Sequence, residues 1–253
     1  MKQSALLGTA VSIATMDETL EWAAEVIQLR VPTQHVVVNA AKLVMMARDA
    51  GLREIVNGCP VVNADGQSVV WAGRLLGVRV PERVTGIDLM VRLLERGGAE
   101  GWRIYLLGAQ HDVVAKLAGR LSKHVTIVGW RDGYWAKDED DNVVEAISGS
   151  GADILFVALP SPWKEEWIAP RLQRLGVPLC VGVGGSFDVL AGVRRRAPTW
   201  MQRSGLEWLF RWSQEPRRLT WRYAKTNVLF AAMVGKELLS RPRSGGMRDG
   251  SNR

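Results

Sequence analysis

The sequence predicts an α/β protein, with a Rossmann-like parallel sheet, helices on both faces and a basic helical appendage at the C-terminal end. Short apolar runs alternate with helical patterns of about ten residues between positions 35 and 190, which is typical of doubly wound parallel sheets. Polar residues or glycines follow these runs, as expected where buried strands end. After Ala191 the strand signals stop, and basic, tryptophan-rich helical patterns follow.

The first part of the chain already shows this alternation. Apolar residues at helical spacing predict a first helix over residues 16–29. The next predicted elements are, in order, strand 35–39, helix 40–50, a second short helix, strand 60–63, helix 68–76 and helix 89–96. Asp88 is the expected N-cap of the last helix, and Gly97-Gly98 is its expected end.

The alternation continues up to residue 183 and then gives way to helices alone. The predicted elements are strands at 103–107, 124–128, 153–159 and 178–183, with helices at 112–121, 138–147 and 165–175. Helices are expected at 200–212 and 218–239, on either side of Glu215-Pro216. We therefore expect a core at 1–195, a helical appendage at 196–240 and a disordered tail at 241–253.

The charge of the chain is concentrated at its C-terminal end. Residues 194–253 hold 14 Lys/Arg and 4 Asp/Glu, a balance of +10. The whole chain carries +7, so residues 1–193 carry −3. A basic segment rich in Trp and Leu suits a phosphate-bearing partner or an anionic membrane surface.

Composition and cysteine usage narrow the class of protein. Hydrophobic residues make up 47% and charged residues 23% of the chain, as in globular proteins. Cys59 and Cys180 lie far apart and show no metal or disulfide spacing, which favours a reducing cytoplasm. The N-terminal segment does not resemble a signal peptide, and no apolar run reaches the roughly 18 residues of a membrane span.

The strand predicted at 60–63 is the one that delivers a carboxylate. Val61 and Val62 form its apolar part, and Asn63, Asp65 and Gly66 stop it. Ligands of open parallel sheets bind just outside the carboxyl ends of the strands. Asp65 is therefore a candidate catalytic residue, although an Asp-Gly pair also forms turns without any other role.

A glycine-rich loop follows the strand at 178–183. Its residues are Gly182, Gly184, Gly185 and Asp188, and its backbone N–H groups are suited to a diphosphate. Phe187 replaces the last glycine of a dinucleotide fingerprint, and a plain strand-to-helix turn explains the pattern equally well.

Two further patterns, an acidic one at 138–140 and a set of three arginines, each allow a functional and a purely structural interpretation. Asp138-Glu139-Asp140 matches the Asp-x-Asp pattern of metal-dependent sugar transferases, but it also fits an acidic first helical turn, and no metal site is predicted. Arg211, Arg218 and Arg222 share a face if one helix continues across Pro216, which suits phosphate oxygens or a solvated basic surface.

Taken together, an ordered set of motifs between residues 35 and 225 resembles the WecG/TagA/CpsF family of bacterial glycosyltransferases, glycosyltransferase family 26. The matching stretches are the segment ending at Asn39, residues 63–66, 82–89, 106–108, 133–134, 161–165, 182–188, 196–198, 205–209, 215–218 and 222–223.

The resemblance implies an inverting transfer of a sugar from a UDP-sugar to an undecaprenyl-diphosphate-linked sugar, without a metal or other cofactor. It implies that Asp65 is the general base and that Tyr134 and Asp188 lie near the donor nucleotide. We also assign Asn39, Gly184 and Gly185 to donor binding. Lys164, Arg211, Arg218 and Arg222 are the residues assigned to the diphosphate and the acceptor.

Two departures from the common family pattern indicate to which branch of the family the chain is most similar. Val37 stands where many members have Thr, and Lys164 replaces a Gln in the segment 160–165. The Ser-Pro-x-Lys-Glu segment is similar to that of GumM-type exopolysaccharide glucosyltransferases. This similarity favours a UDP-hexose as the donor, with glucose as the first candidate. A UDP-N-acetylmannosamine transferase of the same family is the alternative.

The resemblance places the enzyme in the cytoplasm, peripheral on the inner face of the cell membrane, with the appendage on anionic lipid. Nucleic acid is not an expected partner, and self-association is left open. Two other classes remain as alternatives. A non-enzymatic basic nucleotide-binding or nucleic-acid-binding protein fits the charge of the tail, and a dinucleotide oxidoreductase fits the incomplete glycine fingerprint.

Overall fold

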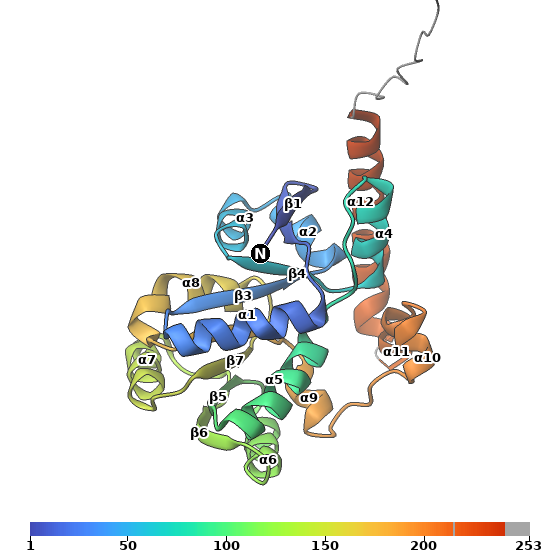
Figure 1. The fold of residues 1–253 in the computed structure, drawn as a ribbon. Helices are drawn as coiled ribbons and strands as arrows, with labels where there is room; N and C mark the ends of the chain where they lie inside the picture. The colour runs from blue at the N-terminus through green and yellow to red at the C-terminus, as the bar shows by residue number, and fades with distance from the viewer. Residues whose placement is uncertain (215, 241–253) are drawn as a thin grey trace, which may run out of the picture.

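The computed structural model describes residues 1–214 and 216–240, and the side chains of all of these except residues 203, 218, 219, 222 and 223. The tail expected to be disordered, 241–253, lies outside this range. Six parallel strands form the main sheet in the order β4-β3-β8-β7-β5-β6 (Figure 1). They are β3 (Thr33–Val38), β4 (Val61–Ala64), β5 (Arg103–Gly108), β6 (Thr126–Arg131), β7 (Ile154–Ala158) and β8 (Leu179–Gly182). The predicted α/β fold with a parallel sheet and flanking helices is confirmed.

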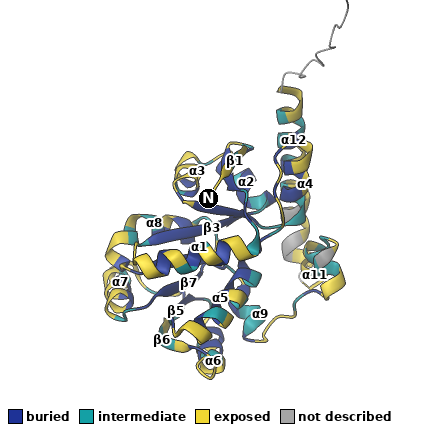
Figure 2. Ribbon diagram, viewed as in Figure 1, coloured by how far each residue is buried: buried dark blue, intermediate teal, exposed yellow. Residues whose placement is uncertain are grey.

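Helices cover both faces of this sheet. One face packs against α1 (Met16–Leu29), α5 (Gly86–Glu100), α6 (His111–Leu121) and α9 (Ser186–Leu190). The other packs against α2 (Ala40–Met46), α3 (Ala50–Asn57), α7 (Asp140–Gly149) and α8 (Trp163–Leu175). Side chains alternate between the two faces along each strand. In β7, for example, Phe156 points to the face covered by α1, α5, α6 and α9, and Leu155 and Val157 point to the opposite face. Figure 2 shows the inner strands β3 and β7 as buried, whereas the edge strand β6 is partly exposed.

The register of the strands brings their carboxyl ends to one edge. Val38 pairs with Ala64, and Gly108 pairs with Ala158, so the loops after β3, β4, β5 and β7 leave the sheet at similar heights. Because all six strands are parallel, the segments that follow them lie along a single edge. This is the edge at which the sequence places its candidate residues.

Helix caps account for the main differences from the predicted boundaries. Thr85, and not Asp88, is the N-cap of α5, and its side chain accepts a hydrogen bond from the Asp88 backbone N–H. The helix also continues through Gly97 and Gly98, which pack close to Trp102 and His124, and it ends only at Gly101 in a left-handed conformation. The predicted end at Gly97-Gly98 was wrong because tertiary packing outweighs the weak helix propensity of glycine.

Three further boundaries differ from the prediction, and one pair of strands was not predicted. The helix predicted at 40–50 ends earlier, at Met46, and the second short helix predicted after it is α3, whose N-cap is Asp49. The strand predicted at 124–128 begins later and runs to Arg131. The helix predicted at 200–212 is divided into α10 (Thr199–Arg203) and α11 (Glu207–Gln214), with Gly205 at φ 76° between them. The hairpin of β1 (Gln3–Leu6) and β2 (Thr9–Ser12) was not predicted.

The C-terminal segment packs against the core at one side of the sheet. The long helix α12 (Pro216–Ser240) lies along α2, and α4 (Gln67–Leu75) lies beside it (Figure 1). Phe230 and Val234 of α12 are buried in the core cluster of α2, α3 and α4. The boundary near residue 195 stays a prediction. Among the described residues, no helix has the length and apolar character needed to cross a bilayer.

Candidate active site

The candidate site lies where the winding of the sheet reverses. The chain moves from β3 outward to β4 and later returns on the other side of β3 with β8, so β3 and β8 flank the switch point. Ligands of such sheets bind in the crevice outside these carboxyl ends. Asn39 follows β3, Asp65 follows β4, and Gly184 and Gly185 follow β8. Lys164 comes from the start of α8, after β7.

Asp65 sits at the first position after β4, where its backbone N–H donates to the Val38 carbonyl oxygen at 2.8 Å. Gly66 turns the chain away at φ 115°, a conformation that favours glycine. The Asp65 side chain is partly buried, and no hydrogen bond to its carboxylate is found within the described part of the chain. Burial raises the pKa of Asp65, and the Arg211 and Arg83 guanidinium groups partly offset this increase. A carboxylate of raised pKa is a better proton acceptor.

Lys164 reaches the glycine-rich turn from the neighbouring helix. Its side chain is 10% exposed, and it crosses Gly182 so closely that a Cβ there would meet Lys164 Cε at 2.8 Å. A Cβ on Gly184 would lie 3.7 Å from Lys164 Nζ. Burial, with a contribution from Lys42, lowers the pKa of Lys164 to about 8.

The glycine turn also receives an arginine from the C-terminal segment. Gly184 adopts φ 53°, and Gly185 is the N-cap of α9. Arg211 of α11 extends to this turn, because a Cβ on Gly185 would lie 3.5 Å from Arg211 Nη2 and 4.0 Å from the Asp188 carboxylate. Asp188 Oδ1 also lies 3.9 Å from Arg194 Nε. The structure therefore brings Gly184, Gly185, Asp188 and Arg211 together.

Asn39 and Tyr134 lie at the same edge in different settings. The Asn39 side chain caps α2 by accepting a hydrogen bond from the Lys42 backbone N–H at 3.0 Å, and its Cβ lies beside Gly66. Tyr134 follows β6, and its side chain is 74% exposed. No contact within the described residues joins Tyr134 to Asp65 or to the glycine turn. Arg218 and Arg222 belong to α12, but their side chains lie outside the described part of the structure.

A network of ion pairs connects the helical appendage to the core near Asp65. Glu207 of α11 pairs with Arg83 at 3.2 Å and with Arg196 at 3.7 Å. Arg196 also pairs with Asp88 at 2.6 Å, and Thr85 donates to that carboxylate at 2.6 Å. Because Arg83 and Glu207 both act on the pKa of Asp65, the network places two more charges near the candidate base.

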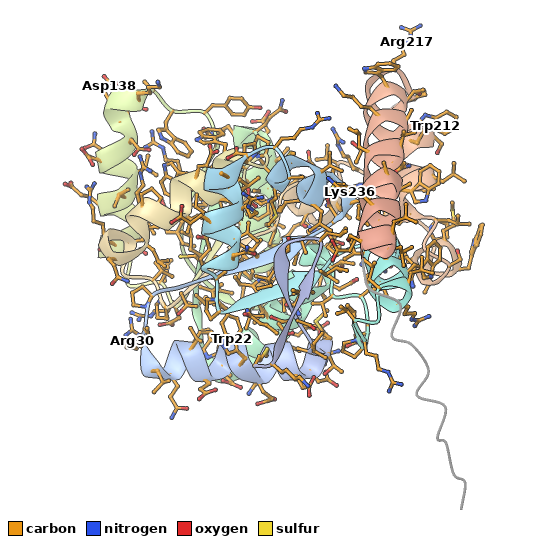
Figure 3. All side chains as sticks on the ribbon, turned by 90° about the horizontal axis from the view of Figure 1, so that it is seen from above. Trp22, Arg30, Asp138, Trp212, Arg217 and Lys236 are labelled. Carbon is orange, nitrogen blue, oxygen red and sulfur yellow. The ribbon has the colours of Figure 1, made fainter. Side chains whose placement is uncertain are left out.

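The residues of the Asp-x-Asp pattern lie at the acidic start of a helix in the structure. Residues 137–139 form a short 3-10 turn, and α7 begins at Asp140. The Asp140 carboxylate accepts hydrogen bonds from Trp135, Trp167 and Arg171. Figure 3 shows Asp138 on the side of the molecule opposite Arg217 and Trp212. In the described ranges, no three His, Cys, Asp or Glu side chains gather into a possible metal site.

Sequence reasoning did not single out three charged residues that the structure adds to the site. Lys42 and Glu165 form an ion pair of 2.6 Å, and their side chains are 4% and 1% exposed. Arg83 lies near Asp65 through the segment that precedes α5. A sequence signal existed for Lys42, which follows Asn39 by one helical turn, and for Glu165, which directly follows Lys164. Their burial, however, depends on contacts between distant segments.

A partly buried carboxylate, a glycine turn and two cationic side chains lie together at the switch point, an arrangement suited to a phosphate-bearing substrate of a group-transfer reaction. Residues 4–244 match the glycosyl transferase WecG/TagA/CpsF family. The chain therefore belongs to this family, and it is a glycosyltransferase that moves a sugar from a UDP-sugar to a lipid-linked acceptor.

Proposed function

We propose that the protein is an inverting, metal-independent glycosyltransferase with Asp65 as its general base. The observation that supports this best is the setting of Asp65, whose pKa is raised by burial and which faces Arg211 near the glycine turn. A sugar hydroxyl is a poor nucleophile at neutral pH, and a positioned base accelerates such a reaction by roughly 10²–10⁴-fold. Asp65 accepts the proton as the hydroxyl attacks the anomeric carbon.

The departing UDP gains charge as the glycosidic bond breaks. We assign its stabilisation to the backbone amides of Gly184-Gly185 and to the side chains of Lys164 and Arg211. In this proposal, Asn39, Tyr134 and Asp188 complete the donor site, and Tyr134 stacks on the uracil ring. Arg218 and Arg222 contact the acceptor diphosphate in this proposal.

The donor is proposed to be a UDP-hexose, and glucose is the first candidate for the hexose. The acceptor is proposed to be an undecaprenyl-diphosphate-linked sugar used in cell-surface or exopolysaccharide synthesis. This assignment to the GumM-like branch depends on Lys164 in the Ser-Pro-Trp-Lys-Glu segment. UDP-N-acetylmannosamine is the alternative donor within the family.

The appendage is proposed to hold the enzyme on the inner face of the cell membrane. Several of its aromatic and aliphatic side chains are exposed, among them Trp200 at 64%, Trp221 at 76% and Leu239 at 89%. Exposed cations accompany them, such as Arg217 and Lys236 (Figure 3). Trp and Leu side chains enter the interfacial layer, and the cations bind anionic headgroups.

Release of UDP from a panel of UDP-sugars tests the proposal, with EDTA present and a polyprenyl-diphosphate-glucose acceptor embedded in anionic vesicles. We expect release from UDP-glucose only when acceptor is present. Higher salt should slow it, because salt screens the attraction of the appendage to the vesicles. Release from UDP-N-acetylmannosamine alone would overturn the branch. A rate abolished by EDTA would overturn metal independence, and no release from any pair would contradict the proposed reaction.

A further inference from the structure

Three ionisable side chains are buried together behind the glycine turn. Lys42 comes from α2, and Lys164 and Glu165 come from α8. Their side chains are 4%, 10% and 1% exposed. Such a cluster is costly to bury, because removing charges from water is repaid only in part by their mutual attraction. A stable fold does not need it, which directs attention to a role in the reaction.

The contacts within the cluster are unequal. Lys42 Nζ lies 2.6 Å from Glu165 Oε1, and Ser161 Oγ donates to the same oxygen at 3.1 Å. Lys164 Nζ is held more loosely, at 3.6 Å from that oxygen. Glu165 Oε2 is buried and has no hydrogen-bond partner among the described residues. Lys42 therefore fixes Glu165, and Glu165 leaves the Lys164 ammonium free to make a second interaction.

That second interaction points to the glycine turn. The Lys164 stem lies across Gly182, and its Nζ reaches Gly184, whose backbone precedes α9. Gly184 and Gly185 are the residues assigned above to the donor diphosphate. The ammonium thus lies on the core side of the proposed diphosphate site, whereas Arg211 reaches the same turn from the appendage.

We propose that Glu165 and Lys42 are positioning residues, which hold the Lys164 ammonium at the glycine turn, where it binds the diphosphate of the UDP donor and of the leaving UDP. This inference rests on the proposed function and assigns to this buried pair a part in that site. Neither Lys42 nor Glu165 touches the substrate in this account. Lys164 is the group in contact with phosphate oxygen.

The electrostatic couplings give the pair a measurable signature. Burial lowers the pKa of Lys164 most, and Lys42 lowers it further, whereas Glu165 and Asp65 raise it. These are the charged groups that face Lys164 from α2, from its own helix and from the loop after β4. With a pKa of about 8, Lys164 loses its proton near the upper end of the physiological range. Diphosphate binding should weaken as it does so.

Single substitutions of the pair should therefore move the alkaline limb of kcat/KM in opposite directions. In Lys42→Met, the limb should move to higher pH, because a repulsive neighbour of the Lys164 ammonium is gone. In Glu165→Gln, it should move to lower pH, because an attractive neighbour is gone. A fall of about one unit in pKa takes the protonated fraction at pH 8 from about one half to about one tenth. Lys42→Arg keeps the charge and should keep the wild-type limb.

Calorimetric binding of UDP and of uridine gives a second readout that does not depend on turnover. At pH 8, Glu165→Gln should lose about fivefold in UDP affinity, in line with the protonated fraction, and should bind uridine as the wild type does. The control is Arg103→Met, which breaks an ion pair with Asp153 at the opposite edge of the sheet. Arg103→Met should cost stability and leave both the limb and the UDP affinity unchanged.

The outcomes separate this inference from the proposed function. Unmoved limbs, or limbs that move in the same direction, would overturn the positioning role while wild-type transfer still stands. Equal losses of UDP and uridine affinity would show a merely structural role and overturn it as well. If the wild type neither binds UDP nor transfers sugar, the proposed function itself fails. Should a single variant not fold, Lys42→Met/Glu165→Gln removes both charges together. Its alkaline limb should move little because the two shifts oppose each other, but its UDP affinity should still fall selectively because Glu165 no longer holds Lys164. Wild-type UDP affinity in it would overturn the inference.

Discussion

Asp65→Asn should fold like the wild type and lose about 100-fold or more in the rate of sugar transfer. The substitution keeps the shape of the side chain and the backbone hydrogen bond from residue 65 to Val38. It removes only the ability to accept a proton from the attacking hydroxyl. Because the proposed donor contacts are Gly184, Gly185 and Lys164 rather than Asp65, UDP should bind to the variant with near-normal affinity. Initial rates and calorimetry measure the two effects separately.

The matched control is Asp49→Asn. Asp49 caps α3 by accepting a hydrogen bond from the Leu52 backbone N–H, and Asn caps helices about as well as Asp does. This control makes the same change in charge away from the switch-point crevice, and its rate should stay near that of the wild type. A transfer rate of Asp65→Asn within a few-fold of the wild type would remove Asp65 from the role of base.

Arg211→Gln should lower kcat/KM by about 10- to 150-fold, the effect of one hydrogen bond to a charged group of about 1.5–3 kcal/mol. The variant should also move the acid limb of the pH profile to higher pH. The reason is that Arg211 is the charged neighbour that lowers the pKa of Asp65 most. Without it, burial raises that pKa further, and the base is protonated over a wider range of pH.

Arg174→Gln provides the control for Arg211→Gln. Arg174 pairs with Asp141 at 2.7 Å, and both side chains are largely exposed, so the net charge changes equally while the site stays intact. Surface pairs of this kind contribute about 0–1 kcal/mol. An Arg211→Gln variant with an unmoved acid limb would show that Arg211 does not act on Asp65 in solution. A loss no larger than in Arg174→Gln would remove Arg211 from the diphosphate site.

The sheet and the edge at which the candidate residues gather could be predicted from the sequence. Strands such as β7 are continuous apolar runs, and β7 is followed by Leu159 and Pro160, which stops the strand; this pattern is local. Once the strands are taken as parallel, their carboxyl ends must share an edge. That inference placed Asp65 and Gly184 at one edge without knowledge of a single contact.

Other features depend on contacts between distant segments and have no local signal. The burial of Lys42 against Glu165 joins segments 123 residues apart, and Glu207 with Arg83 joins segments 124 residues apart. The sequence shows the charges but not their partners. The same holds for Phe230, whose burial against α2 makes the appendage part of the core cluster.

Under the proposed function, the core and the appendage contribute residues to one site. The core supplies Asp65, Lys164 and the glycine turn, and α11 supplies Arg211, held in place by Glu207 and its two arginine partners. A segment bound to a membrane surface by its exposed tryptophans would therefore carry a diphosphate-binding arginine with it. In this account, binding of the lipid-linked acceptor and completion of the donor site are coupled through α11.

The anomeric configuration of the product tests the central claim most directly. The account has Asp65 deprotonate a hydroxyl that attacks from the face opposite UDP, and a single displacement of this kind inverts the anomeric centre. Wild-type enzyme with UDP-α-glucose and the polyprenyl-diphosphate-glucose acceptor should therefore give a β-linked disaccharide, which proton NMR coupling constants identify. An α-linked product would contradict the single displacement and, with it, the role given to Asp65.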